Sequence, residues 1–222
     1  MIGDESSYSL PARSMSNPHL SIWPQPDTYG GGANWTGSNA EVHHNSGIMN
    51  HWFYILSVGK SGINGIGNAY NVTGIGISKA EKIAYRSLTV YMTSGTNFAN
   101  ARTHAIQAAT DLYGVCSREM MSVTNAWHAV GVGSQYTMSV VNFTNQPPVS
   151  TNKTVENNCG DINIQNVTVT SGATLTLKAA GNINVQDVTV NNNSKLILDA
   201  VGKVNIGINF KVELGSIWKI IK

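Results

Sequence analysis

His43 and His44 are the side chains in this sequence best placed to do chemistry, because they stand at the start of a stretch with the pattern of a buried helix. Apolar residues recur in that stretch at helical spacing, namely Met49, Trp52, Phe53, Ile55 and Leu56. Asn45 or Ser46 is expected to cap the helix with a side-chain oxygen, and Gly59 stands where a left-handed residue would end it. The pattern predicts an imidazole fixed beside a cleft; the alternative is a loop histidine before a core helix.

These histidines do not by themselves predict a metal site. Side chains of adjacent residues point apart, whereas a catalytic zinc ion needs three protein ligands and an open position for water. No histidine is followed directly by a glutamate, so the motif His-Glu-x-x-His is absent. The histidines on the expected helices, His51, His104 and His128, are interpreted as structural or exposed. We therefore expect that this chain alone neither binds zinc tightly nor cleaves peptides.

Three further amphipathic helices are expected after the first one, beyond a Gly- and Asn-rich loop at residues 60–74. The second helix begins with Ser78 and Glu81, which have the spacing of a capping box. The other two are predicted at about residues 97–113 and 117–131. Four such helices joined by short loops should pack as an orthogonal bundle, with their Met and aromatic residues in its core.

The chain repeats itself from Asp161 onward. The segment DINIQNVTVTSGATLTLKAAG is followed, at a period of 21 residues, by NINVQDVTVNNNSKLILDAVG, and a third copy has one extra residue near Ile208. Alternation of β-branched and polar residues predicts strands. One short repeat cannot bury its apolar face alone, so three stacked repeats indicate a β-solenoid. A small antiparallel β-sandwich is the alternative.

Together these patterns predict an α+β protein, with a mainly α-helical orthogonal bundle followed by a small all-β repeat domain. Residues 1–135 are expected to form the helical lobe, and within it residues 1–40 form a long structured loop beside the cleft. Residues 136–158 contain one candidate strand and a Pro-Pro pair and are predicted to be a linker. Residues 159–222 are the predicted three-repeat β domain.

Composition excludes some functions. The net charge is +2 and there is no run of Lys or Arg, so there is no electrostatic footprint for nucleic acid. No apolar run approaches the ~20 residues of a membrane span, and the N-terminal residues lack the apolar core of a signal peptide. The charged fraction of 12% suits an extracellular bacterial protein. Two cysteines are too few for a disulfide framework; Cys116 is interpreted as a buried thiol, with a bridge to Cys159 as the alternative.

Several motifs occur in order through the first part of the chain. VHHNSGI stands at residues 42–48, preceded by ARSMSNP and PDTYGG and followed by NFANAR, AATDLYG and NAWHAVGV. From Ile2 to about Val132 the chain resembles the C-terminal, mostly helical lobe of the thermolysin-like zinc metallopeptidases. The β tail is loosely similar to add-on modules of secreted Bacteroidetes-type proteins. The resemblance implies a secreted or cell-surface bacterial protein whose signal peptide is not in this chain.

The resemblance gives His43 a role in the transition state. His43 matches the family histidine that donates a hydrogen bond to the developing oxyanion, and His44 is a bystander. The family usually has Asp-Asn-Gly-Gly before the Val-His pair, and its aspartate orients the histidine. Here Ser38 replaces that aspartate and Asn39 matches, while Glu41 is a candidate to supply a carboxylate from another angle.

The resemblance also implies a substrate-binding surface. Arg13 matches the arginine that hydrogen-bonds the substrate carbonyl, for which a rigid, charged guanidinium is suited; the alternative is a surface arginine paired with an acid such as Asp27. Ile2 corresponds to an isoleucine that lines the pocket after the scissile bond. Ala12 replaces a residue that is often larger, which indicates a roomier pocket. Asp4 corresponds to a calcium ligand, and the alternative is a solvated acid near the terminus.

The implied function is that of the C-terminal part of a secreted zinc metalloendopeptidase, which hydrolyses peptide bonds. Its zinc ligands are expected upstream of Met1, in a missing N-terminal catalytic lobe, and calcium is a second implied cofactor. The expected partners are a peptide or protein substrate, that lobe and, through the β tail, a cell surface. The alternative is a non-catalytic truncated lobe that acts as a weak peptide-binding or surface-tethering module. In either case we expect exposed apolar surface around Ile2, Trp52 and Tyr29.

Overall fold

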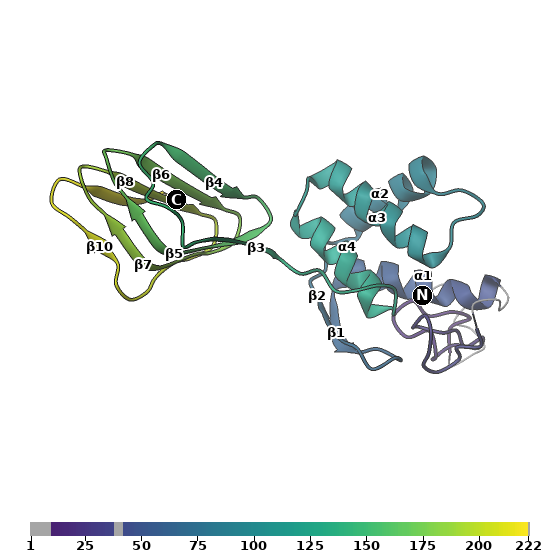
Figure 1. Ribbon diagram of the computed structural model, residues 1–222. Coiled ribbons are helices and arrows are strands. Elements are labelled where there is room, and N and C mark those ends of the chain that lie inside the picture. Colours follow the sequence, from purple (N-terminus) through teal and green to yellow (C-terminus); the bar gives the residue numbers. More distant parts are fainter. Residues whose placement is uncertain (1–9, 38–41, 222) are drawn as a thin grey trace. The chain divides into compact units, whose positions relative to one another are not determined.

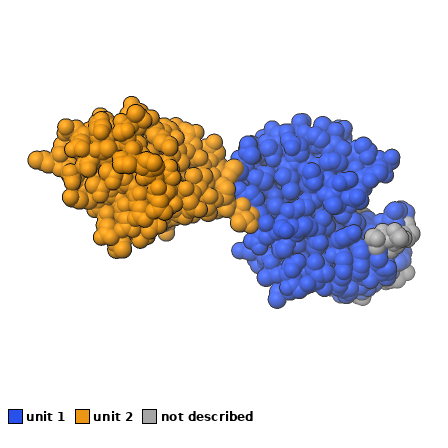
Figure 2. Space-filling view, in the orientation of Figure 1, with its two compact units in different colours: residues 1–136 blue, residues 137–222 orange. Residues whose placement is uncertain are grey.

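The computed structural model describes residues 10–37 and 42–221 of the 222-residue chain. The chain divides into two compact units, residues 1–136 and residues 137–222, drawn as ribbons in Figure 1 and in separate colours in Figure 2. The first unit is mainly helical and the second consists of strands, which confirms the predicted α+β fold class.

The described part of the helical unit starts with a loop at residues 10–37 and continues into helices joined by short connections. One β-hairpin interrupts the series. Its elements are α1 (Val42–Val58), β1 (Lys60–Ile63), β2 (Ala69–Val72), α2 (Ile77–Arg86), the π-helical turn η1 (Ser87–Tyr91), α3 (Phe98–Tyr113) and α4 (Arg118–Ala129).

Helix α1 lies at the centre of this unit's core. Its apolar stripe is fully buried at Ile48, Ile55 and Leu56, and Trp52 stacks on Trp127 of α4 with ring centroids 4.9 Å apart. Each such side chain contributes about 1.5–3 kcal/mol when it leaves water. The prediction that Trp52 is exposed is therefore wrong, because Trp52 packs against α4 and only 2% of its surface is accessible.

The C-terminal ends of the helices agree with the sequence predictions more closely than their N-terminal ends do. Gly59 has φ 81° and its N–H closes on the carbonyl of Ile55, so the left-handed end of α1 is as predicted. Helix α1 already begins at Val42, which places Asn45 and Ser46 inside the helix and makes their predicted capping role wrong.

The predicted capping box of α2 is also wrong. The residue before the helix is Gly76, which has no side-chain cap, and Ser78 lies within the first turn. Backbone hydrogen bonds from Ile75 and Gly76 to the carbonyls of Leu56 and Ser57 hold the entry to α2 against the end of α1. Tertiary contact, rather than a local cap, fixes this start.

A π-helical turn changes which residues of the second helix face the core. Leu88 follows Ala80 and Ala84 at helical spacing, which predicts that it is buried in the apolar stripe of the second helix. Leu88 is instead 62% exposed, and the neighbouring Ser87 is buried. The wider turn of η1 rotates the chain relative to a regular α-helix. Leu88 is thereby displaced from the core to the surface.

The segment at residues 60–74, predicted as a loop, contains the antiparallel hairpin β1–β2. Its Gly and Asn residues form the turn, where Asn64 bonds the carbonyl of His128 at 3.1 Å. The backbone N–H of Gly65 donates to Oγ1 of Thr28 at 3.0 Å, so the hairpin turn is held against the N-terminal loop.

The turn between α3 and α4 contains Cys116, which was interpreted as a buried thiol. Cys116 is half-buried, with φ 57°, between the end of α3 and Ser117, whose side chain caps α4. Neither cysteine of the chain is free. The interpretation of Cys116 as a buried thiol is therefore wrong.

The second unit is a β-solenoid of about four turns, as the repeats predicted. All strand pairs within its two sheets are parallel, in the orders β10-β7-β5-β3, with β9 also on β7, and β11-β8-β6-β4. Figure 1 shows the strands stacked in two layers. They are β3 (Ser139–Thr144), β4 (Lys153–Asn157), β5 (Gly160–Val169), β6 (Thr174–Ala179), β7 (Ile183–Val190), β8 (Lys195–Ala200), β9 (Val204–Ile206), β10 (Lys211–Val212) and β11 (Ile217–Ile221).

Equivalent residues of successive turns lie over one another. Ile162 pairs with Ile183, and Leu175 with Leu196, so the repeated apolar positions fill one continuous buried column. Because each column buries its side chains against the next turn, the stack stabilises turns that could not fold alone.

The prediction of a linker at residues 136–158 is wrong. Strands β3 and β4 in this segment pair with β5 and β6 and form the first turn of the solenoid. Phe143 and Val149 are 7% and 6% exposed. They belong to the same buried cluster as the apolar column of the later repeats and cover its first turn. The repeat was hidden because only strand-length fragments, and not the turn sequences, resemble the later copies.

Candidate functional site

Arg13 and His43 lie in different segments, and Ser46 connects them. Nη1 of Arg13 donates to Oγ of Ser46 at 3.3 Å, and Oγ of Ser46 donates to the backbone carbonyl of His43 at 2.7 Å. A helical serine can reach the carbonyl one turn before it. The structure thus brings together the two residues singled out in the sequence. Asp27, the acid considered as a partner for Arg13, instead pairs with His19 at 3.1 Å.

Gln25 completes this small network from inside the loop. Its side chain is 3% exposed, and its Nε2 donates both to the carbonyl of His43 and, at 3.1 Å, to Oγ of Ser46. Ser46 therefore accepts two hydrogen bonds and donates one, which is the full capacity of a hydroxyl group. This leaves the Ser46 side chain little freedom to rotate.

Gly47 allows the loop to approach the helix this closely. A Cβ atom at this position would lie 2.5 Å from Cβ of Gln25 and 2.6 Å from the carbonyl oxygen of Pro26. Real Cβ atoms do not tolerate such contacts. The glycine that follows Ser46 therefore sets the distance between the loop carrying Gln25 and the first turns of α1.

A second attachment holds the Arg13 segment lower on the same helix. His51 is 2% exposed, its Nδ1 lies 2.7 Å from the carbonyl of Met15, and its Nε2 lies 3.2 Å from Nζ of Lys60. Burial lowers the pKa of His51, and the neighbouring Lys60 lowers it further, while the bond to Met15 opposes this shift. The geometry fits a neutral imidazole that donates to Met15 and accepts from Lys60, so His51 is structural, one of the two roles expected for it.

His43 and His44 point in different directions at the start of α1. His43 is exposed, whereas Nε2 of His44 lies 2.7 Å from the carbonyl of Asn34 and is held in the loop. Successive helix residues are about 100° apart around the axis. The two imidazoles are thus separate groups, and His43 is the more exposed of the two residues.

The remaining predicted site residues fall into two sets. Ala12 is half-buried beside the chain that carries Trp23, which is 63% exposed. The others lie outside the described residues, and they are Ile2, Asp4, Ser38, Asn39 and Glu41.

A large apolar groove begins at the same turn of α1. It encloses about 760 Å³ between α1, the end of η1, the start of α3 and residues 131–133, and Ser46 lines it together with Val42, Asn45 and Met49. Val42 is 75% exposed at its edge. Asn45 is 7% exposed, its Nδ2 donates to the carbonyl of Gly37, and its Oδ1 is buried without a hydrogen-bond partner. Tyr29 also lines the groove and is half-buried.

The described residues do not fit a zinc site. Within residues 10–37 and 42–221, no three side chains of the types His, Cys, Asp and Glu form a group that could hold a metal ion. His19, His44 and His51 are engaged by Asp27, Asn34 and Met15. What this part of the chain offers chemically is a charged guanidinium and an exposed imidazole on one rigid frame. No helix within the same ranges has the length and apolar character required to span a membrane.

Sequence reasoning missed the contacts of Ser46 and Gln25 with the predicted site residues. Ser46 was interpreted as a cap because serine before an apolar stripe has that pattern, although the same pattern fits a serine one turn inside the helix. Gln25 is flanked by prolines in a loop, and nothing in its spacing distinguishes it. Only the folded loop shows that Ser46 bonds Arg13 and that Ser46 and Gln25 both bond the carbonyl of His43.

Comparison with known proteins places the chain in a family. The family described as "Thermolysin metallopeptidase, alpha-helical domain" matches residues 1–132, more than half of the chain. Thermolysin from Alicyclobacillus acidocaldarius subsp. acidocaldarius is 45% identical over 120 residues, which are 54% of this chain and 21% of that protein. Bacillolysin from Bacillus caldolyticus gives the same values, and bacillolysin from Bacillus amyloliquefaciens is 41% identical over 137 residues, 59% of this chain and 22% of that protein. The chain spans about a fifth of the length of these relatives. It belongs to the thermolysin metallopeptidase family, and its first 132 residues match the alpha-helical domain of that family.

Proposed function

We propose that this chain supplies the substrate-binding side of a secreted zinc metalloendopeptidase whose zinc ligands lie upstream of Met1. The observation that carries the proposal is the link from Arg13 through Ser46 to His43, in a chain that matches the thermolysin alpha-helical domain. Two groups that act on one peptide bond must be held in fixed relative positions. The Ser46 and Gln25 hydrogen bonds fix the backbone of His43 relative to Arg13.

In this proposal Arg13 binds the carbonyl oxygen of the substrate on the leaving-group side. Its guanidinium has several donors in a rigid fork, so one remains aligned on the substrate while another bonds Ser46. His43 donates a hydrogen bond to the oxyanion that develops at the reacting carbonyl. Both groups bind and orient the substrate, and neither cleaves the peptide bond by itself. Ile2 and Ala12 complete the neighbouring substrate pocket.

The proposed partner of this lobe is the N-terminal catalytic lobe. The groove beside Ser46 has apolar residues exposed at its edges, 75% for Val42 and 62% for Leu88, and a buried Oδ1 of Asn45 with no donor. An apolar hollow of this size is costly in water, and so is an unsatisfied buried acceptor. A second lobe that fills the groove and donates one hydrogen bond to Asn45 would remove both costs.

The remaining parts of the proposal concern the location of the protein and a bound calcium ion. A secreted or cell-surface location suits a peptidase that acts on extracellular peptides or proteins, and the β-solenoid is the part proposed to contact the cell surface. Calcium is proposed as a structural ion, with Asp4 among its ligands.

The proposal is tested first by reading the coding sequence upstream of Met1 and then by expressing the longer protein. We expect an in-frame His-Glu-x-x-His motif within about 150 codons, a typical domain length, and casein cleavage that a zinc chelator abolishes. Leu88→Asp at the groove edge should lower this activity by weakening contact between the lobes. Val115→Asp changes an equally apolar, 74% exposed residue outside the groove and should not.

Two results would contradict the proposal. One is an upstream stop codon with no zinc motif, and the other is a longer protein without chelator-sensitive cleavage. Either would favour the second candidate, a non-catalytic lobe that binds peptide weakly, which draws support from the absence of a metal-binding group among the described residues.

A further inference from the structure

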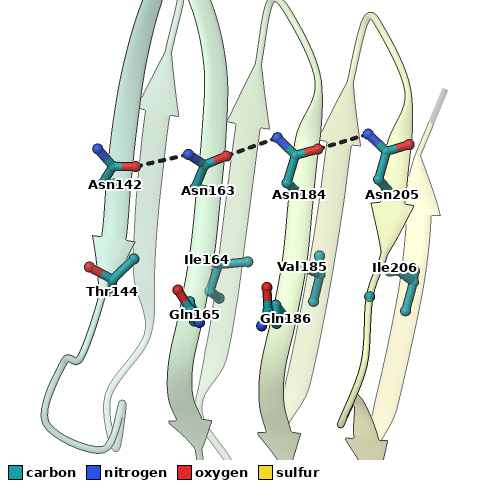
Figure 3. Close-up of a pocket in the computed structure, with 11 residues that line it drawn as sticks. Asn142, Thr144, Asn163, Ile164, Gln165, Asn184, Val185, Gln186, Asn205 and Ile206 are labelled. Carbon is teal, nitrogen blue, oxygen red and sulfur yellow. Dashed lines mark hydrogen bonds between the residues drawn. The ribbon is translucent and has the colours of Figure 1, made fainter.

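One face of the solenoid carries a continuous row of asparagine side chains. Asn142, Asn163, Asn184 and Asn205 stand at equivalent positions on β3, β5, β7 and β9, each 21 residues after the last. The side-chain nitrogens of Asn163, Asn184 and Asn205 each donate to the side-chain oxygen of the preceding asparagine in the row, at 2.9, 2.8 and 2.7 Å. Figure 3 shows these bonds running across the strands. Such a ladder stabilises the stack, which is a sufficient structural reason for this row.

A second row lies two residues further along the same strands, and the ladder does not explain it. Thr144, Gln165 and Gln186 form this row, with Gly207 at its end. Two residues of strand separate the rows by about 6.6 Å, and neighbouring strands lie about 4.8 Å apart. The two rows line a hollow of about 370 Å³ on the outer face of the sheet.

The glutamine amides are partly oriented by a neighbouring carboxylate. Nε2 of Gln165 donates to Oδ2 of Asp187 at 3.3 Å, and Asn209 donates to Oδ1 at 2.6 Å. Hydrogen bonds from Asn209, Gln165 and Gln186 lower the pKa of Asp187, so it stays ionised and keeps its acceptor role. With its nitrogen turned toward Asp187, Gln165 presents its carbonyl oxygen to the hollow.

The chemistry of the hollow selects a class of ligand. Its lining residues are Asn, Gln, Thr, Gly, Ile and Val, with no charged side chain among them. Amides offer donors and acceptors side by side, as hydroxyl groups do. Nucleic acids and acidic polysaccharides need basic contacts that this lining lacks, and an extended peptide pairs with the edge of a sheet rather than its face.

We propose that this hollow binds a neutral, hydroxyl-rich linear polysaccharide that lies across the strands, along the axis of the solenoid. The ligand's hydroxyls bond the free donors and acceptors of the two amide rows, whose regular spacing matches a polymer better than a single small molecule. No aromatic side chain lines the hollow, so a stacking contribution is absent and a single chain binds weakly. This inference does not rest on the proposed peptidase function.

The test is native affinity electrophoresis of the full 222-residue chain in gels containing hydroxyethyl cellulose, galactomannan or, as the charged comparison, alginate. We expect at least one neutral polymer to retard the chain and alginate to have no effect. The double variant Gln165→Ala/Gln186→Ala removes two side-chain partners without breaking the asparagine ladder. It should weaken retardation about tenfold, the scale for losing two modest hydrogen bonds.

The matched control is Thr154→Ala/Thr176→Ala, on the outward face of β4 and β6 in the other sheet, which should bind as the unchanged chain does. Melting curves of both double variants check that the solenoid is intact. The inference is overturned if neither neutral polymer retards the chain, if alginate retards it equally, or if the glutamine variant binds normally.

Discussion

The guanidinium of Arg13 reaches the hydroxyl of Ser46 across 33 residues of sequence, with Nη1 and Oγ 3.3 Å apart. Because Ser46 also bonds the carbonyl of His43, movement of the Arg13 loop is transmitted to the first turn of α1. His51 ties the same loop to the helix again through the carbonyl of Met15. The arginine proposed to bind substrate and the proposed oxyanion donor therefore lie on one frame with two points of attachment.

The first prediction concerns this frame in the longer, zinc-containing enzyme that we propose. Arg13→Ala and His43→Ala should each lower kcat/KM about a hundredfold, the scale for losing one donor to a developing oxyanion. The fold should survive, since His43 is exposed and Arg13 is only partly buried. The measurement is steady-state cleavage of a chromogenic peptide.

Arg118→Ala is the matched control, because this exposed arginine starts α4 away from the groove. Arg118→Ala should leave kcat/KM within about twofold of the unchanged enzyme. Ser46→Ala should give a smaller loss than Arg13→Ala, because it frees both groups without removing either. Full activity in Arg13→Ala or in His43→Ala would show that the role given to that residue is wrong.

The second prediction concerns the approach of loop and helix at Gly47. Gly47→Ala should destabilise the helical unit, because overpacking costs about 1–3 kcal/mol and outweighs the ~1 kcal/mol that alanine gains in a helix. The backbone oxygen of Pro26, 2.6 Å from the new Cβ, cannot move cheaply. Urea denaturation measures the change. Gly95→Ala, whose Cβ meets only Oγ1 of Thr93 at 4.0 Å, should have no such effect, and equal stability of the two variants would contradict the argument.

The third prediction concerns pH. Burial lowers the pKa of His51 in the folded chain below its usual 6.5. As pH falls through about 6.5 the unfolded chain takes up a proton first, so the unfolded state binds more protons and stability declines toward the folded pKa. The melting temperature should therefore fall between pH 7.5 and pH 5, and the slope should be smaller in His51→Gln. Asp111, whose hydrogen-bond partners Tyr91, Gln107 and Arg86 lower its pKa to about 2, titrates well below this window. An unchanged slope in His51→Gln would assign the pH dependence to other groups.

Much of the helical unit could be predicted because its signals are local. An apolar stripe and a glycine stop define α1, and the same holds for α3 with Gly114, whose φ is 94°. The errors occur where tertiary contact decides. The carbonyls of Leu56 and Ser57 fix the start of α2, so a Ser-x-x-Glu pattern within the helix imitated a cap.

The candidate site was predictable only in part, for a related reason. Arg13 and His43 were identified because their motifs resemble a family, and neither their distance nor their shared partner follows from spacing. Gln25 and Gly47 act through contact between two segments, which no periodicity records. The solenoid repeat was evident from Asp161 onward. The first coil of the solenoid differs from the later repeats in the loops between its strands, and its sequence therefore predicted a linker.

That first turn leads to the fourth prediction. A fragment of residues 137–222 should fold cooperatively with a strand-rich circular dichroism spectrum, whereas residues 159–222 should be clearly less stable. The shorter fragment loses Phe143 and Val149 and exposes the apolar column behind them, at a cost of about 1.5–3 kcal/mol for each large side chain left uncovered. Helical spectra, or equal denaturation midpoints for the two fragments, would contradict the assignment of β3 and β4 to the solenoid.

The last prediction concerns the chain as it stands. A catalytic zinc ion needs three protein ligands and an open coordination position, and among the described residues no such group of side chains occurs. His43 and His44 diverge, and His51 is committed to Met15 and Lys60. Purified residues 1–222 should therefore retain well under one zinc ion per chain after dialysis, by elemental analysis, and should not cleave casein in a chelator-sensitive way. Stoichiometric zinc together with chelator-sensitive cleavage would place the active site within this chain and give its histidines the metal-binding role denied to them here.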